Sequence, residues 1–350
     1  MWGAPLPRHH AGAQALNVAM DDLLPGSAAP PHLQWAAEAL WQQLEPYLPG
    51  ISVEVVASAD STNTRLLERA RTGGGRQDAP ITTPGELEAM RQSGAPGGAR
   101  DAAGGPYGRR QGDTQPCLLV AEHQTLGRGR QGRGWLSAPG ASLTFSLALP
   151  LAPRDWSGLS LAVGVALADT LEPPDPDAIA PRIGLKWPND LWLMDAGLHR
   201  AGRKLGGVLI ETVAVGGRRM VVVGVGLNVA PLPAAPGAPR ELTHGYASLQ
   251  ELTPALQAPA VLHRVALPLV RALLQFEREG FAGFAPAYAR RDLLRGRPVA
   301  TVDAANADAS WSGVAEGVAA NGALRLRGDD GVLRDIISGE VSVRLTASAR

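Results

Sequence analysis

Alternating and continuous apolar stretches divide most of the chain into short elements. Ile51, Val53 and Val55 alternate with polar residues, which predicts a strand with one buried face. Short apolar runs bounded by turn-forming residues predict further strands. The predicted strands cover residues 51–55, 117–121, 143–149, 183–187, 191–194, 205–213 and 218–225, with a hairpin turn at Gly216-Gly217 between the last two.

Apolar residues at helical spacing predict helices around these strands. The predicted helices cover residues 33–44, a segment from the turn at 60–63 to about 71, 159–171 and 261–279. Pro46 and the pair Pro173-Pro174 are expected to end the first and third of them. Pro268 is expected to kink or interrupt the last, because proline has no N–H for the helical ladder.

Two parts of the chain depart from this style. From about Arg297 onward, short strands are separated by turn signals at 321–322 and 329–331, which predicts a small all-β barrel. Residues 72–115 are rich in Gly, Arg, Gln and Ala with few large apolar residues, so we expect a surface insertion that buries little core. Residues 1–32 are rich in Pro, Gly and Ala and are expected to be loose.

Composition excludes several classes of protein. The formal net charge is zero, which argues against a role in coating DNA or an anionic membrane. Cys117 is the only cysteine, so neither an intramolecular disulfide nor a cysteine-based zinc site can form. No signal peptide and no membrane-spanning apolar stretch are evident. We therefore expect a cytoplasmic protein.

The strongest chemical signal is the segment Gly127–Trp135, GRGRQGRGW, which lies between two predicted strands. Its four glycines allow the backbone to approach a ligand, and its three arginines supply forked donors suited to phosphate. Trp135 is suited to stacking on a ring. The segment lacks the Gly-Lys-Ser/Thr of a Walker A loop, and no helix directly follows it. A basic surface loop, or one that contacts RNA, is the competing interpretation.

Four further segments are weaker signals when each is taken alone. Lys186–Asp190, KWPND, could bind phosphate and Mg²⁺, or could be an ordinary turn with Asn-Asp as its hydrogen-bonding residues. Lys204–Glu211 could place a lysine beside two glycines that leave room for a ligand, or could be a plain strand entry. The segments Gly224–Asn228 and Ser61–Asn63 could bind small polar groups, although N-capping explains the second equally well.

Together, in this order, these segments resemble the catalytic domain of the biotin–protein ligases. The resemblance rests on the run Asp60–Asn63, Glu122-His123-Gln124 with the following Gly-Arg segment, Lys186–Asp190, Lys204–Glu211 and Gly224–Asn228. It extends to 245–249, where Tyr246 occupies a position at which the family often has Trp, and to an SH3-like C-terminal domain ending at Gly339–Arg344.

The resemblance implies an α+β fold with a mixed sheet, similar to the class II aminoacyl-tRNA synthetases, and a small C-terminal SH3-like β-barrel. It implies an N-terminal extension with one short helix at 1–50, a catalytic domain at 51–292 and a C-terminal domain at 293–350. It also implies that biotin and ATP, with Mg²⁺, form biotinyl-5′-AMP. A lysine of the biotin carboxyl carrier protein of acetyl-CoA carboxylase then accepts the biotin.

Site roles follow from the same resemblance. Lys204, Arg130 and Arg128 are expected to be catalytic, and Asp190 to bind the metal. The expected biotin-binding residues are Ser61, Thr62, Asn63, Gln124, Gly127, Arg128, Gly129, Arg130, Lys204 and Gly206. The expected nucleotide-binding residues are Arg130, Arg133, Trp135, Lys186, Asn189, Asp190, Asn228 and Arg344, and Glu340 is expected to help from the C-terminal domain.

Three departures and alternatives stay open from the sequence. Some family members carry an N-terminal winged helix-turn-helix, but the residues before the first strand show no second and third helix, so we expect no DNA binding. A lipoate or octanoate ligase of the same fold, and a nonenzymatic RNA-binding protein, are the alternative functions. Both a monomer and a homodimer are compatible with the sequence.

Overall fold

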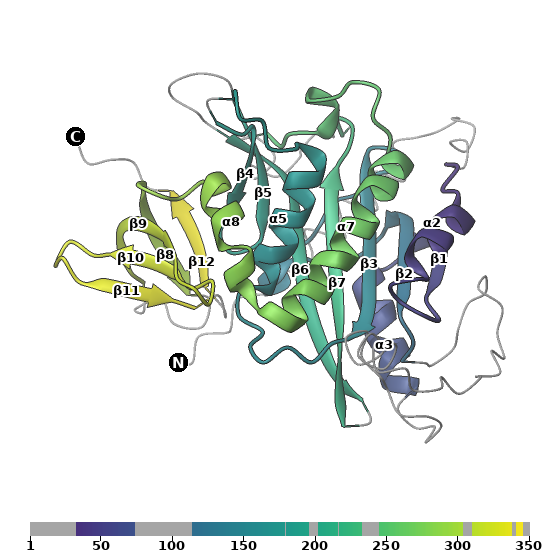
Figure 1. Cartoon of the computed structure of the whole chain (residues 1–350). Helices are drawn as coiled ribbons and strands as arrows, with labels where there is room; N and C mark the ends of the chain where they lie inside the picture. Colours follow the sequence, from purple (N-terminus) through teal and green to yellow (C-terminus); the bar gives the residue numbers. More distant parts are fainter. Residues whose placement is uncertain are drawn as a thin grey trace, which may run out of the picture.

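A computed structural model describes residues 33–73, 114–178, 180–195, 202–215, 217–232, 245–303, 310–337 and 341–345. These residues form a larger mixed sheet, a smaller antiparallel sheet and the helices that pack on the larger sheet (Figure 1). The larger sheet comprises β1 (Ser52–Ala59), β2 (Cys117–Gln124), β3 (Ser142–Pro150), β4 (Ile183–Lys186), β5 (Asp190–Met194), β6 (Gly202–Val215) and β7 (Arg218–Asn228).

The larger sheet has the strand order β1-β2-β3-β7-β6-β5-β4. β1 and β2 are parallel, and the other neighbours are antiparallel, so the sheet is mixed as expected. β3 and β7 lie at its centre and pair along nine residues, from Ser142 with Asn228 to Pro150 with Met220. This central pair carries polar and glycine residues on one face and large apolar residues on the other.

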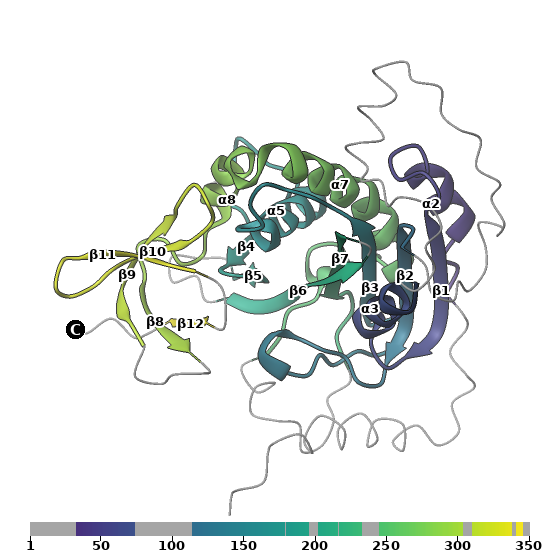
Figure 2. The same cartoon turned by 90° about the horizontal axis from the view of Figure 1, so that it is seen from below.

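Helices cover the two faces of this sheet unequally. α5 (Leu159–Leu171) and α7 (Ala258–Glu279) lie along one face (Figure 2), where they enclose the main hydrophobic core with α2 (Ala37–Leu44). α3 (Thr62–Gly73) covers part of the opposite face and forms a smaller core through Leu66, Leu67 and Ala70. The polar and glycine residues of the candidate site lie on the same face.

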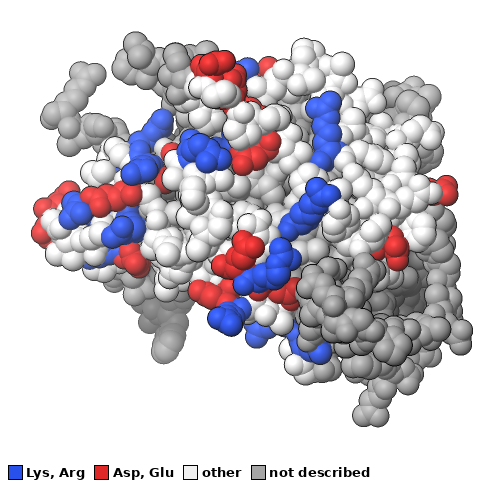
Figure 3. All heavy atoms as spheres, viewed as in Figure 1, with Lys and Arg blue, Asp and Glu red and all other residues white. Residues whose placement is uncertain are grey.

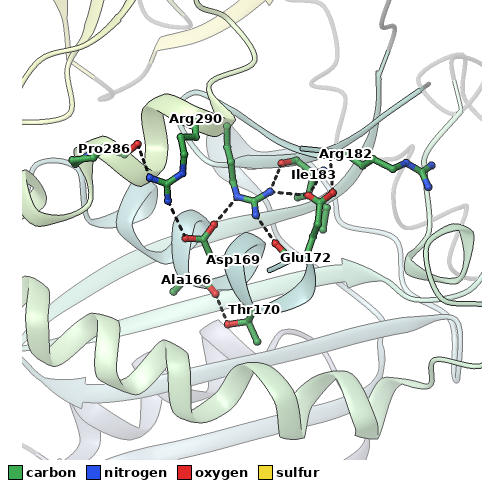
Figure 4. Close-up of polar contacts among 9 residues, drawn as sticks. Ala166, Asp169, Thr170, Glu172, Arg182, Ile183, Pro286 and Arg290 are labelled. Atoms are coloured by element: carbon green, nitrogen blue, oxygen red, sulfur yellow. Dashed lines mark hydrogen bonds and ion pairs between the residues drawn. The ribbon is translucent and has the colours of Figure 1, made fainter. Parts of the chain in front are cut away.

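A buried arginine fixes α8 (Ala285–Arg291) to α5 and β4. Arg291 is 4% exposed and pairs with Asp169 at 2.6 Å and Glu172 at 2.8 Å. It also donates to the backbone oxygen of Ile183, so one guanidinium joins three elements; Figure 4 labels its partners Asp169, Glu172 and Ile183. Loss of either carboxylate would leave the buried guanidinium charge without a partner, which is strongly destabilising. These contacts therefore hold α8 against the end of the sheet that adjoins the C-terminal domain.

The C-terminal residues form a separate five-stranded antiparallel sheet of order β11-β10-β9-β8-β12. Its strands are β8 (Pro298–Asp303), β9 (Ser312–Val318), β10 (Leu324–Arg327), β11 (Leu333–Ile336) and β12 (Val341–Leu345). The small all-β unit expected from the turn signals is confirmed. Gly322 and Gly331 have φ values of 80° and 75°, in the left-handed region that glycine tolerates best.

Gly322 also joins the two sheets. Its carbonyl oxygen accepts a hydrogen bond from the buried Trp187 Nε1 at 3.0 Å, and a Cβ at this position would lie 2.7 Å from Gly158 Cα. Gly158 directly precedes α5, so the turn before β10 packs against backbone. Backbone cannot move aside as the end of a flexible side chain could. The C-terminal sheet is therefore attached next to Trp187, in the KWPND turn.

Gly322→Ala should loosen this attachment. Gly331→Ala is a matched control, because its backbone has the same left-handed φ but no atom lies within 4 Å of the added methyl. Both variants place a Cβ on left-handed backbone, which lowers stability. Only Gly322→Ala also creates an overpacked contact, which costs about 1–3 kcal/mol more. Thermal unfolding should show the larger loss for Gly322→Ala. Equal losses in the two variants would show that the contact with Gly158 contributes nothing.

Most predicted elements are confirmed, although several begin or end at other residues than expected. The first helix begins at Ala37 rather than at residue 33, because Leu33 N and Trp35 Nε1 bind Glu122 and hold that segment outside the helix. The strand that was expected to end at Trp187 ends at Lys186, before a cis Trp187–Pro188 bond. α7 runs through Pro268 without interruption, because buried apolar residues on both sides of it pack on the sheet.

The expected insertion at 72–115 and the loose residues 1–32 fall largely outside the described residues. In the part that the structure describes, no helix is both long and apolar enough to cross a membrane.

Candidate active site

Strand register gathers a polar, glycine-lined floor on the face opposite α5 and α7. Thr144 pairs with Gly226, Gly226 with Gly207, and Gly207 with Asp190, in a row across four strands. Directly paired residues share a face of a sheet, so this row faces one side. A second row, two residues along each strand, contains Ser146, Gly224 and Leu209.

Two of these glycines are needed because side chains lie directly on them. A Cβ at Gly224 would lie 2.2 Å from Asn63 Oδ1, and a Cβ at Gly226 would lie 2.5 Å from Trp135 Cε2. No L side chain could occupy either position without moving its neighbour. The motif Gly224–Asn228 therefore brings the α3 amide and the Trp135 indole against the sheet.

A buried polar cluster lies above Gly224, where α3 begins. Gln124 Oε1 accepts from Thr62 N at 2.8 Å, and Thr62 Oγ1 lies 3.1 Å from the same oxygen. Ser146 Oγ lies 2.6 Å from both Thr62 Oγ1 and Asn63 Oδ1. All four side chains belong to buried residues. Buried polar groups need partners, so the cluster is suited to a small polar ring rather than to an apolar one.

The Gly-Arg segment forms a short hairpin next to this cluster, which we call the strap (127–135). Trp135 N donates to Gly127 O at 2.8 Å, and Gly129 N donates to Arg133 O at 2.7 Å. The backbones of Arg128 and Gly134 pair in an antiparallel β-bridge. The tip turns at a residue with positive φ, Gln131 at 56°. This arrangement explains the glycines, since a Cβ at Gly127 would lie 2.3 Å from Trp135 O.

The strap arginines differ in their contacts. Arg128 forms an ion pair with Glu211 at 2.9 Å, and the same carboxylate accepts from Asn63 Nδ2. Arg130 donates to Asn189 Oδ1 at 3.4 Å. Burial lowers the pKa of Arg130, against the opposing effect of the nearby Asp190 carboxylate. Arg133 points along the strap and donates to Gln131, so the structure does not bring its side chain to the floor.

Lys204 lies at the other end of the floor, on β6. Its Nζ is 2.8 Å from Asp190 Oδ1 and 5.9 Å from the centre of the Trp135 ring. Its backbone oxygen accepts from Asn228 Nδ2 and from Ala247 N, which fixes the strand where the side chain begins. The backbone of Lys204 is thus held in place, and its ammonium lies next to the Asp190 carboxylate and the Trp135 ring.

Lysine is rare in this chain, and both lysines lie near Asp190. Of its 33 lysine and arginine residues, two are lysines, Lys186 and Lys204. Lys186 lies in the same row as Asp190, with its Nζ 4.7 Å from the centre of the Trp192 ring. The other 31 of these 33 residues are arginines. An ammonium is a compact point charge, whereas guanidinium is a planar fork.

Several predicted site residues need comment. Ser61 Oγ accepts from Thr64 N at 3.4 Å, which fits the helix-start interpretation. A Cβ at Gly206 would face Leu227 on the helix-covered side, so Gly207 replaces Gly206 on the site floor. The side chain of Arg344, in β12, and the whole of Glu340 lie outside the described residues.

Sequence reasoning missed Ser146 and Glu211 as site residues. Ser142, Thr144 and Ser146 alternate with apolar residues in β3, and this period of two was the available signal for a polar face. Glu211 was visible only as the end of a motif. Its role as the shared partner of Asn63 and Arg128 depends on contacts across 148 and 83 residues of sequence, respectively.

The donor set fits Mg²⁺ only together with a ligand. Among the described residues, no three His, Cys, Asp or Glu side chains gather in one place. Asp190 is the floor's carboxylate, and it is 21% exposed beside Lys204. Mg²⁺ in nucleotide sites is held by one or two carboxylates together with phosphate oxygens, so Asp190 can contribute only part of a coordination shell.

Comparison with known proteins agrees with this geometry. Residues 110–228 match the Biotin/lipoate A/B protein ligase family, and residues 296–344 match the Biotin protein ligase C terminal domain. The Bifunctional ligase/repressor BirA of Escherichia coli is 31% identical over 306 residues, covering 87% of this chain and 77% of that protein. The Biotin--[acetyl-CoA-carboxylase] ligase of Paracoccus denitrificans is 32% identical over 218 residues, covering 61% of this chain and 85% of that protein.

A solved structure shows the same fold. The biotin protein ligase from Aquifex aeolicus, in complex with biotin and ATP, superposes with a TM-score of 0.57 at 24% identity, covering 84% of this chain and 99% of that one. The mixed sheet and the separate C-terminal sheet are shared features. On the extent of the sequence match to its relatives, the chain belongs to the biotin protein ligase family.

Proposed function

We propose that the chain joins biotin to ATP, forming biotinyl-5′-AMP, and then transfers biotin to a lysine of a biotin carrier protein. One observation carries the proposal: a buried polar cluster and a paired lysine occupy opposite ends of one glycine-lined floor. The cluster is suited to the ureido ring, and Lys204 to the carboxylate. Biotin has these two features at opposite ends of an apolar arm.

The spacing of the two ends supports this orientation. Asn63 lies over Gly224, whereas Lys204 contacts Asp190, two strands away and one side-chain repeat along. Strand spacing makes that about 10 Å across the sheet and about 7 Å along it. Gly226 and Gly207 lie between the two ends, with the Trp135 indole as an apolar wall. The apolar arm of the acid is proposed to run along this indole.

The first step joins two anions, which repel each other. An oxygen of the biotin carboxylate attacks the α-phosphorus of ATP, and pyrophosphate leaves. Lys204 lies where it can neutralise the carboxylate, and Arg130 where it can neutralise the phosphoryl oxygens as charge shifts between them. Lys186, Asn189 and Asn228 are proposed to hold the nucleotide, and Trp135 to stack on adenine. When bound, Mg²⁺ would neutralise phosphate charge beside Asp190.

The second step transfers the acyl group. The neutral amine of a carrier lysine attacks the carbonyl carbon of the mixed anhydride, AMP leaves, and the amine loses a proton. We propose that the carrier is that of acetyl-CoA carboxylase and that residues 51–292 carry the chemistry. Gly322, in the proposed C-terminal domain 293–350, accepts a hydrogen bond from Trp187 of the KWPND turn, whose Lys186 and Asn189 are proposed to hold the nucleotide.

A carrier-labelling reaction tests the proposal. The protein is incubated with biotin, MgATP and a biotin carrier domain, and the products are probed with streptavidin. We expect carrier labelling that depends on both biotin and ATP. A carrier domain whose acceptor lysine is changed to arginine should stay unlabelled. A mass gain of the carrier by a lipoyl or octanoyl group, measured by mass spectrometry with lipoate or octanoate in place of biotin, would instead support a lipoate-type ligase.

RNA binding by the arginines is not favoured by their contacts. Arg128 is paired with Glu211, and on the C-terminal sheet Arg325, Arg327 and Arg334 each pair with a carboxylate. Blue and red side chains accordingly lie side by side over that sheet (Figure 3). Paired arginines offer little net charge to a phosphate backbone.

Arg130→Gly should release the reactive intermediate. Arg130 reaches from the strap to Asn189, so its loss unties the strap tip from the floor and removes a phosphate partner. Free biotinyl-5′-AMP would then acylate lysines on bystander proteins. Mass spectrometry of an added bystander such as serum albumin should find biotinyl-lysine with Arg130→Gly but not with the wild type. Carrier-restricted labelling by the variant would show that Arg130 does not retain the adenylate.

A further inference from the structure

Ser146 occupies the centre of the polar cluster and is fully buried. It lies in the middle of β3, and its Oγ is 2.6 Å from Thr62 Oγ1 and 2.6 Å from Asn63 Oδ1. Ser146 is thus a residue of the sheet that contacts both Thr62 and Asn63, two side chains proposed to hold biotin. Those two side chains come from α3, which packs on the sheet but does not belong to it.

The direction of each hydrogen bond in the cluster can be deduced. Asn63 Nδ2 faces two acceptors, Glu211 Oε2 at 2.9 Å and Leu209 O at 3.3 Å, so the amide oxygen must face Ser146. An amide oxygen only accepts, and the serine hydroxyl has one proton. That proton therefore goes to Asn63 Oδ1.

The remaining bonds follow from this assignment. With its proton used, Ser146 Oγ can only accept from Thr62 Oγ1 at 2.6 Å. Gln124 Oε1 already accepts from Thr62 N, which turns its amide NH₂ away, toward the strap at Gly127. One hydroxyl thereby sets which atoms of the cluster are used internally and which are presented to a ligand.

We propose that Ser146 is a specificity-determining positioning residue for the acid substrate. It orients Thr62 and Asn63 so that the cluster presents a fixed donor and acceptor pattern to a polar ring such as the ureido group. An acid with an apolar end, such as octanoate, leaves that pattern unpaired and is rejected. This inference rests on the proposed function, since it concerns how the same site selects biotin.

Selection of this kind is strong because the groups are buried. A site built to hydrogen-bond its substrate rejects analogues without those groups, since its polar atoms are then left without partners. Removing the Ser146 hydroxyl leaves Asn63 Oδ1 without its donor and frees the Thr62 hydroxyl to rotate. Biotin should then bind more weakly, while the nucleotide end of the floor, at Lys204 and Asp190, stays intact.

The test is biotin-dependent exchange of pyrophosphate into ATP by Ser146→Ala and by Ser146→Cys. Cysteine fills the same space with a much weaker donor, so it separates loss of the hydrogen bond from loss of packing. We expect the KM for biotin to rise about 10- to 100-fold in both variants, the cost of an unpaired buried group. The KM for ATP and kcat should stay near wild type, and octanoate should compete better.

Ser52→Ala is the matched control. Ser52 is also a fully buried hydroxyl on the same sheet, but its partner is Glu54 on β1, away from the floor. It should leave the KM for biotin unchanged. An unaltered KM for biotin in Ser146→Cys, or parallel rises in KM for biotin and ATP, would overturn the proposal. Absence of biotin-dependent exchange in the wild type would instead refute the proposed function.

Discussion

Lys204→Ala is expected to lower biotin-dependent pyrophosphate exchange by about 10²- to 10³-fold, the usual loss when one preorganised charge-stabilising group is removed. The loss should fall mainly on kcat, because the lysine acts most strongly as negative charge is brought together on two reacting groups. Asp190, 2.8 Å away, would be left without its cation and would add repulsion against phosphate. The measurement is exchange of labelled pyrophosphate into ATP at saturating biotin.

Lys204→Arg and Arg154→Ala complete this test. Arginine keeps the charge but not the compact ammonium, so exchange should still fall in Lys204→Arg. Arg154 is an exposed cation outside the floor, so its loss should leave exchange unchanged. Wild-type exchange in Lys204→Ala would show that this lysine does not neutralise the carboxylate, and the proposed orientation of biotin would be wrong.

Gly224→Ala should weaken biotin binding at the opposite end of the floor. The added methyl would lie 2.2 Å from Asn63 Oδ1, so the amide must move and lose its contact with Ser146 or with Glu211. One displaced buried hydrogen bond corresponds to a rise of about 10- to 100-fold in the Kd for biotin. Isothermal titration with biotin alone measures this directly.

Gly184→Ala is the control for the change from glycine to alanine in a strand. Its nearest neighbour is the flexible end of Leu293 at 3.3 Å, and it lies on the edge strand β4, three strands from Gly224, so biotin binding should be preserved. Thermal unfolding of both variants would separate a local effect from a general loss of stability. If Gly224→Ala binds biotin as the wild type does, Asn63 is not part of the biotin site.

Apolar patterning predicted most strands, because both faces of the central strands are largely buried and only apolar runs suit that environment. β3 shows the limit of such reasoning. Its alternation of Ser142, Thr144 and Ser146 with apolar residues marks a polar face, but it does not show which hydroxyl belongs to the site. The function of Ser146 depends on Asn63, which is 83 residues away, and that contact exists only once α3 has packed on the sheet.

The choice between Gly206 and Gly207 also depended on information that is not local. The two glycines are adjacent, and adjacent residues in a strand face opposite sides. A register shift between Leu191 and Trp192, opposite this segment, decides which glycine faces the floor together with Lys204. The motif itself was easily recognised, but a bulge in the neighbouring strand pair cannot be deduced from it.

The strap shows the reverse case. Four glycines among three arginines predicted a loop that folds on a ligand, and the structure provides a hairpin whose close backbone contacts require Gly127. The partners of its arginines could not be predicted. Glu211 and Asn189 come from other motifs, and their proximity depends on the pairing of β6 with β5 and β7.

The most direct test of the central claim is a crystal structure of the protein with biotin and a nonhydrolysable ATP analogue. The ureido ring should contact Thr62, Asn63 and Gln124, and the carboxylate should lie near Lys204, with the analogue's phosphates under the strap. Density for biotin or nucleotide away from residues 124–135 and Lys204 would contradict the account.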